Sequence, residues 1–281
     1  MSGWLEPFEF AFFRNGLAVA TLAGALCGLV GTFVVLRSMS YIGHGLSHAI
    51  FGGFAASSLL GVNYLLGAGV WGVASAMAIG GVTRRRPIGS DAAIGVITTA
   101  SFAIGLVLGD VFRGPRQSFD AALFGSILGV SGGDVLAVGA VTLGAAVVVF
   151  FGYRRLLFTT FDPDVAAVSG INTGRVDALL MLVLATSVLV TMQVVGATLL
   201  AATLVIPATV ARMLTNSFSR MLWLSTGIGA LCGFVGMVAS YHLDWKSGPT
   251  IVLVGTALFV LSLVLSGRRG LSRVAHVGHV G

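Results

Sequence analysis

Residues 31–53 read "GTFVVLRSMSYIGHGLSHAIFGG" and place two features of the chain side by side. The stretch opens with the end of an apolar run, 10–36, that stops at Arg37. It continues to His44 and His48, which stand four residues apart among glycine, serine and alanine. An apolar run of about 20 residues can cross the hydrocarbon core of a bilayer as a helix. The stretch therefore predicts one membrane helix that ends at Arg37 and a second that begins with two histidines.

Apolar runs of this length recur along the chain. Of its 281 residues, 56% are hydrophobic and 9% are charged, whereas a soluble domain carries about a quarter charged residues. We expect an all-α, polytopic membrane protein with a single transmembrane domain, 1–281. Eight and nine crossings both fit, because the run 197–213 is short and contains Pro207. The predicted spans are 10–36, 44–62, 63–83, 92–112, 134–152, 177–196, 197–213, 221–241 and 249–266.

Two further segments complete the predicted topology. Residues 119–131, "FDAALFGSILGVS", are apolar but too short to span, which suggests a partial or re-entrant helix covered by protein or lining a cavity. Residues 153–176 form the longest polar stretch, and their arginine pair places them in the cytoplasm. Most arginines between spans follow spans of one direction, whereas Arg113 and Arg116 fall on the other side. The arginine-rich ends and the C-terminus are therefore expected in the cytoplasm; these arginines are Arg37, Arg84, Arg85, Arg86, Arg154, Arg155, Arg212, Arg220, Arg268 and Arg269.

The two histidines near the start of the second predicted helix have the spacing of a metal site. Residues at i and i+4 lie on one helical face, and imidazole suits zinc, copper, iron and nickel. The alternative is a pair of rings at a membrane interface, hydrogen-bonded to carbonyl groups. Ionisable groups inside membrane spans are costly and mostly line a pathway. The spacing therefore predicts that His44 and His48 are metal ligands.

The sequence argues against enzymatic chemistry on this chain. A zinc protease helix needs glutamate directly after its first histidine, and position 45 is glycine. There is no glycine-rich phosphate loop, and Lys246 is the one lysine of the chain. If ATP drives the protein, another polypeptide must bind the nucleotide.

Three other stretches carry polar groups. Pro207 interrupts the apolar run within 195–220, which predicts a kinked or broken helix and a short cytoplasmic helix over roughly 208–219. The stretch 241–253 holds His242, Asp244 and Lys246 at an outer turn, where a solvated loop is the default interpretation. The tail 276–280 holds two more histidines, and we expect a frayed end there.

Several separated stretches together resemble the permease subunits of bacterial ABC importers for zinc, manganese and iron. The resemblance spans residues 31 to 253 and therefore covers nearly the whole chain. It is carried by "GTFVVLRSMSYIGHGLSHA", "DAALFGSILGVS", "DPDVAAVSGI", "VGATLLAATLVIPATVAR" and "DWKSGPTIVL".

The resemblance implies a type II ABC importer permease fold, similar to the vitamin B12 importer permease. It also implies two permeases side by side, two cytoplasmic ATPases that bind ATP, and an extracytoplasmic metal-binding protein. The chain itself would bind no cofactor. The family pattern Gly-Asp-x-x-x-His-Ala, whose Asp and His meet the metal, matches His44 and His48, with histidine replacing aspartate. The family's ATPase-docking run matches Ile206 to Arg212, so coupling residues are expected at Pro207, Arg212, Met213, Leu214, Thr215 and Asn216.

The transported metal stays open between zinc, manganese and iron. Imidazole favours zinc, and the loss of the usual carboxylate argues further against manganese. Two alternatives remain at this point. One is a permease for a metal chelate of the siderophore or cobalamin type, and the other is an ATP-independent channel or carrier.

Overall fold

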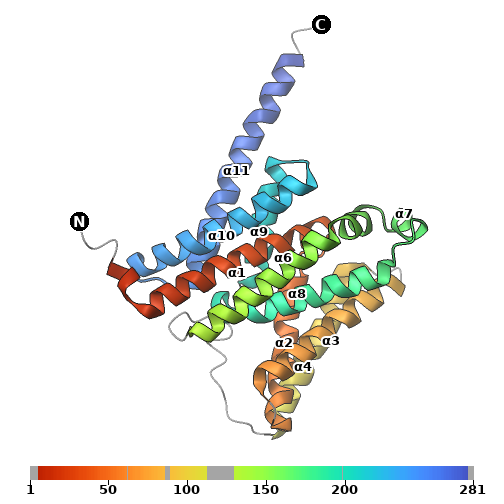
Figure 1. Cartoon of the computed structure of the whole chain (residues 1–281), viewed down its shortest axis with the longest axis vertical. Helices are drawn as coiled ribbons and strands as arrows, with labels where there is room; N and C mark the ends of the chain where they lie inside the picture. The colour runs from red at the N-terminus through yellow and green to blue at the C-terminus, as the bar shows by residue number, and fades with distance from the viewer. Residues whose placement is uncertain (1–5, 62, 86–88, 113–129, 198, 278–281) are drawn as a thin grey trace.

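The computed structural model describes residues 6–61, 63–85, 89–112, 130–197 and 199–277, and the regular structure in those ranges is helical. Figure 1 shows long helices crossing one another, with α11 projecting away from the others. The elements are η1 (Glu6–Glu9), α1 (Ala11–Leu36), α2 (Ile42–Leu60), α3 (Tyr64–Arg85), α4 (Ser90–Phe112), α6 (Gly132–Phe161), α7 (Pro163–Val168), α8 (Thr173–Val195), α9 (Leu200–Leu214), α10 (Phe218–Leu243) and α11 (Ser247–Val277).

Six helices among the described residues are long and apolar enough to cross a membrane. This confirms the predicted all-α, polytopic class, while the exact number of crossings stays a prediction. The re-entrant helix expected at 119–131 falls almost wholly outside the described residues. The six candidate spans are Ala11–Leu36, Leu65–Thr83, Gly132–Phe161, Thr173–Met192, Phe218–Leu243 and Ser247–Leu265.

Helix α1 lies at the centre of the fold and packs most extensively on α10, with α9, α6 and α8 around it. Glycines let the two helices approach to backbone contact. A Cβ atom at Gly24 would meet the carbonyl of Gly229, and a Cβ atom at Gly233 would meet the carbonyl of Ala20. Small residues at such contacts are typical of membrane helix pairs, because lipid supplies no hydrophobic force between helices.

Helices α2, α3 and α4 form a separate lobe at one side of this centre (Figure 1). They pack on one another, and the lobe joins the centre where α3 contacts α8 and where α2 contacts α8 and α9. Gly61 ends α2 in the left-handed conformation, with φ of 63°, which glycine adopts without a Cβ penalty. Because α2 packs on α4 within the lobe, the predicted histidines of α2 lie close to α4.

Side-chain caps fix the N-terminal ends of α6, α7 and α8, the three helices that share the polar stretch 153–176. Ser131 and Asp134 form a capping box at the start of α6. Asp162 accepts a hydrogen bond from the backbone N–H of Val165 at the start of α7, and Asn172 caps α8 in the same way. The structure corrects the predicted spans here, because α6 continues as a helix to Phe161, well past the predicted end at 152.

The predicted helix break at Pro207 is wrong. Helix α9 runs without interruption through Pro207 to Leu214, so the separate helix expected over 208–219 does not form. Pro207 is buried, and the carbonyl of Leu204 just before it lies against Gly31 of α1. Membrane helices tolerate an interior proline where neighbouring helices surround it.

Helix α11 also differs from its predicted span. It includes His276 and ends at Val277, whereas a frayed tail was expected, and His279 lies outside the described residues. Its 31 residues give a helix of about 46 Å, longer than the hydrocarbon core of about 30 Å. Both cysteines, Cys27 and Cys232, are buried and free.

Candidate functional site

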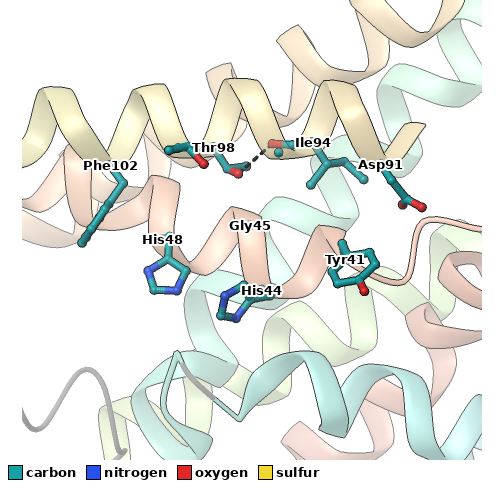
Figure 2. Close-up of a pocket in the computed structure, with 10 residues that line it drawn as sticks. Tyr41, His44, Gly45, His48, Asp91, Ile94, Thr98 and Phe102 are labelled. Carbon is teal, nitrogen blue, oxygen red and sulfur yellow. Dashed lines mark hydrogen bonds between the residues drawn. The ribbon is translucent and has the colours of Figure 1, made fainter. Parts of the chain in front are cut away.

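The imidazole rings of His44 and His48 lie side by side on one face of α2. Their centroids are 4.5 Å apart and their planes are inclined at 77°. Figure 2 shows both rings on the same side of the helix, as the four-residue spacing predicts. His44 is exposed and His48 is half-buried. The two rings are therefore close enough for their nitrogens to meet one ion, and one of them is open to the surface.

A hollow of about 520 Å³ lies between α2 and α4 and includes both histidines in its lining. Phe102 closes one end of it, with its ring centroid 5.2 Å from that of His48. Asp91 stands toward the opposite end, beyond Tyr41, as Figure 2 shows. We call this hollow the histidine groove; its lining is Tyr41, His44, Gly45, His48, Asp91, Ile94, Gly95, Thr98, Thr99 and Phe102.

Two glycines on either side of His44 bring α2 close to two neighbouring helices. A Cβ atom at Gly45 would lie 2.8 Å from Cγ2 of Thr98 in α4. A Cβ atom at Gly43 would lie 2.6 Å from Cδ1 of Leu204 in α9. At contacts below 3.0 Å, a larger residue would force a neighbouring group to move. The small residues around the histidines thus place α2 directly against α4 and α9.

The connection from α1 to α2 is a tight, hydrogen-bonded turn. Ser38 adopts a left-handed conformation with φ of 54°, and its N–H donates to the carbonyl of Val35. The N–H of Met39 donates to the carbonyl of Val34 at 2.9 Å, which completes a Schellman motif. The N–H of Ile42 then donates to the carbonyl of Met39. Hydrogen bonds therefore connect the end of α1 to the first turn of α2, which carries His44.

The groove offers two neutral nitrogen ligands of intermediate softness. Within the described part of the chain, no group of three or more His, Cys, Asp or Glu side chains gathers around one point. Asp91 lines the same hollow but does not complete such a group. A metal ion here would have two protein ligands from this chain, which suits a site that must release its ion.

The sequence alone did not indicate that α4 forms one wall of the histidine groove. Thr98 and Phe102 lie about fifty residues beyond the histidines, and nothing in their local pattern marks them. Asp91 did carry a signal, because it is a carboxylate directly before the predicted apolar span 92–112. An acidic residue at such a position faces polar surroundings more often than lipid.

The residues predicted to contact an ATPase gather at the turn between α9 and α10, which is separate from the histidine groove. Leu214 is 43% exposed, whereas Met213 is half-buried and its sulfur accepts a hydrogen bond from Ser262 of α11 at 3.5 Å. The N–H of Ser217 donates to Oγ1 of Thr215 and tightens the turn. Arg212 and Asn216 are exposed, whereas Pro207 is buried within α9.

The turn between α10 and α11 contains the third group of polar residues. Asp244 ends α10 in a left-handed conformation, and Oγ of Ser240 donates to the carbonyl of Trp245 at 2.6 Å. His242, Asp244 and Lys246 are exposed there. They are not part of any three-ligand group within the described ranges, and the default interpretation of a solvated turn needs no revision.

The protein is helical and multi-pass, and two histidines line a groove between two of its helices. This is the architecture of a membrane transport subunit. The family model described as "ABC 3 transport family" matches residues 9–266, so the chain belongs to that family. It is accordingly a permease subunit of a metal-ion ABC transporter, in which a separate subunit hydrolyses ATP. Membership of the family decides against the ATP-independent channel or carrier.

Individual relatives match the chain over nearly its whole length. It is 35% identical over 265 residues to a manganese transport system membrane protein of Halalkalibacterium halodurans, covering 94% of this chain and 91% of the relative. It is 32% identical over 267 residues to a probable iron transport system membrane protein of Haemophilus influenzae, covering 95% and 98%. Among solved structures, PsaBC from Streptococcus pneumoniae in complex with Fab is similar, with a TM-score of 0.81, 32% identity and coverage of 92% and 94%.

Proposed function

We propose that this chain carries a divalent transition-metal ion, manganese or zinc, into the cytoplasm, and that His44 and His48 bind the ion on its way. The observation that supports this proposal is the pair of imidazole rings, 4.5 Å apart at the histidine groove, in a permease of this family. Water or a second permease copy would complete the coordination. A two-ligand site holds an ion weakly enough to let it pass.

Two considerations point to different metals. Relatives are described as manganese transport proteins, which favours manganese. The imidazole pair favours zinc, because manganese prefers oxygen ligands. Competition between zinc, manganese and iron for uptake by the reconstituted transporter decides among the metals. Uptake of a chelate alone, with no uptake of the free ions, would instead favour the chelate importer.

The histidines are tested by replacing each with alanine in the complete transporter. His44→Ala and His48→Ala should each lower metal uptake while the ATPase stays assembled. His242→Ala is a matched control, because His242 lies at the α10–α11 turn and does not line the groove. Wild-type uptake by the His44→Ala, His48→Ala double variant would overturn the site.

We also propose that the α9–α10 turn docks on the cytoplasmic ATPase. Support comes from the exposed Leu214, Arg212 and Asn216, which lie together at the turn, and from the matching family run. The remaining proposed partners are an extracytoplasmic metal-binding protein and a second permease, either a second copy of this chain or a related one.

A further inference from the structure

The α9–α10 turn is anchored in the protein by an aromatic side chain directly after it. Phe218 is the first residue of α10 and is half-buried. Its ring centroid lies 5.7 Å from that of Phe33 in α1, 5.4 Å from that of Tyr153 and 5.9 Å from that of Phe161, both in α6. We call these four residues the aromatic cluster. Edge and tilted contacts at such distances are favourable, so the turn cannot move far without moving α1 and α6.

A polar contact follows one helical turn after Phe33. The guanidinium group of Arg37 donates at 2.6 Å to Asp177 of α8 and at 3.1 and 3.2 Å to Thr159 and Thr160 of α6. The side chains of Arg37 and Asp177 are 12% and 20% exposed. A charge-assisted bond in a sheltered site is stronger and more directional than a surface ion pair. This arginine contact fixes the ends of α1 and α6 and the start of α8 relative to one another.

Arg37 is also the residue that caps α1 before the tight connection to α2. Backbone hydrogen bonds from Ser38, Met39 and Ile42 hold the first turn of α2 in a fixed position relative to Arg37. His44 follows Arg37 by seven residues in the chain. Packed contacts and backbone hydrogen bonds thus run from the docking turn to the metal ligands.

We propose that Phe218 and Arg37 are positioning residues that transmit displacement of the α9–α10 turn to His44 and His48. This inference rests on the proposed function, since it assigns the turn to the ATPase and the histidines to the metal. When the ATPase moves the turn, the aromatic cluster moves the ends of α1 and α6, which the arginine contact holds together. The hydrogen-bonded turn after Arg37 then carries the motion into α2. The histidine groove then changes shape against α4. A cluster that merely held the helix ends together would affect assembly and leave coupling intact.

Phe218→Leu tests the proposal in the complete transporter, reconstituted with its ATPase and metal-delivery protein. The readouts are assembly, ATP turnover, metal affinity and the number of metal ions imported per ATP hydrolysed. We expect assembly, ATP turnover and affinity to be retained, with imported metal per ATP falling on the order of tenfold, within the range of known coupling effects. Phe218→Tyr should restore the ratio. The control is Phe234→Leu, because Phe234 lies in the same helix and is 43% exposed.

A second set of variants keeps the proposal falsifiable if Phe218→Leu does not assemble. Thr160→Val removes one hydrogen bond of Arg37, and Phe161→Leu thins the aromatic cluster. Asp177→Arg combined with Arg37→Asp should recover part of the ratio that either change alone loses. An unchanged ratio in Phe218→Leu, or in these variants, overturns the inference. If the wild-type transporter imports neither manganese nor zinc, the proposed function itself fails, and that result is distinct from an unchanged ratio.

Discussion

Ser225 of α10 donates a hydrogen bond of 2.5 Å from its Oγ to the backbone carbonyl of Gly28 in α1. The bond crosses the most extensive helix contact of the protein, and both residues are buried. The carbonyl of Gly28 is reachable because the glycine has no side chain to hold the helices apart. The centre of this fold thus depends on backbone contact between two helices.

The α1–α10 contact predicts a sharp difference between two glycines of α10. Gly229→Val would press a side chain onto the backbone of α1, whereas Gly227 faces open space. Because backbone cannot rotate away, we expect Gly229→Val to destabilise the protein by about 3 kcal/mol or more. Gly227→Val is the control and should unfold close to the wild-type temperature. Thermal unfolding in detergent measures both, and equal melting temperatures would contradict the contact.

A second glycine pair tests the shape of the histidine groove. Gly45→Ala would place Cβ 2.8 Å from Thr98, whose Oγ1 is itself bound to the carbonyl of Ile94. The strain, about 1–3 kcal/mol, should move α2 away from α4 and weaken metal binding. Gly95 lines the same groove with nothing near its Cβ direction, so Gly95→Ala is a matched control. Calorimetric titration with metal compares them, and equal affinities would show that the groove tolerates displacement.

The replacement of the family's aspartate by histidine predicts a change in metal preference. His44→Asp should shift the ratio of manganese to zinc uptake toward manganese, because a carboxylate oxygen suits manganese better than imidazole does. Total uptake is a poor measure, since an added negative charge attracts any divalent ion. Competitive uptake from mixed solutions gives the ratio. If the ratio does not change, selectivity is set elsewhere, for instance by the delivery protein.

Substitutions at Leu214 and Met213 test whether the α9–α10 turn docks on the ATPase, because Leu214 is exposed and Met213 is half-buried. Leu214→Asp should release the ATPase or uncouple hydrolysis from transport, because interface energy is concentrated in a few apolar side chains. Met213→Asp should in addition disturb the contact with Ser262 of α11. Val168→Asp is the control, since Val168 is 87% exposed on α7, within the segment 153–176 that is the other candidate for docking.

Cysteine crosslinking locates the docking surface directly. Single cysteines at 213–217 should crosslink to the ATPase, and the native cysteines are buried and will not compete. Crosslinks from 153–176 with none from 213–217 would move the docking surface to the segment that contains α7.

The left-handed conformation of Ser38 predicts a test of the α1–α2 connection. Every residue with a Cβ pays about 1–2 kcal/mol at φ of 54°, and a β-branched side chain crowds the backbone there more than serine does. Ser38→Val should therefore lower stability further and lower metal uptake, because it loosens the turn before His44. Ser38→Gly fits the same backbone and should keep uptake at the wild-type level. Unfolding in denaturant and uptake assays on both variants check the prediction.

The sequence predicts local features of this fold well and long-range ones poorly. The first apolar run and α1 agree within a residue, because Arg37 marks the end of the run. Pro207 misled the prediction, because a local rule for proline does not include the packing of α9 on Gly31. The side-by-side histidines followed from helical spacing alone. Two other features depend on tertiary contacts that no local pattern contains. One is the wall of the histidine groove in α4, and the other is the pairing of Arg37 with Asp177, 140 positions away.

Helix α4 has α2 and α3 as its main packing partners, at a distance from the tight backbone contact of α1 with α10. Substitutions along α4 can therefore accumulate over evolutionary time with little penalty for the folding of the centre. They still alter the wall of the histidine groove opposite His44 and His48. Descendants of one ancestral gene could in this way diversify in cargo while sharing a single scaffold, with the lobe acting as the adaptable part of an otherwise constrained molecule.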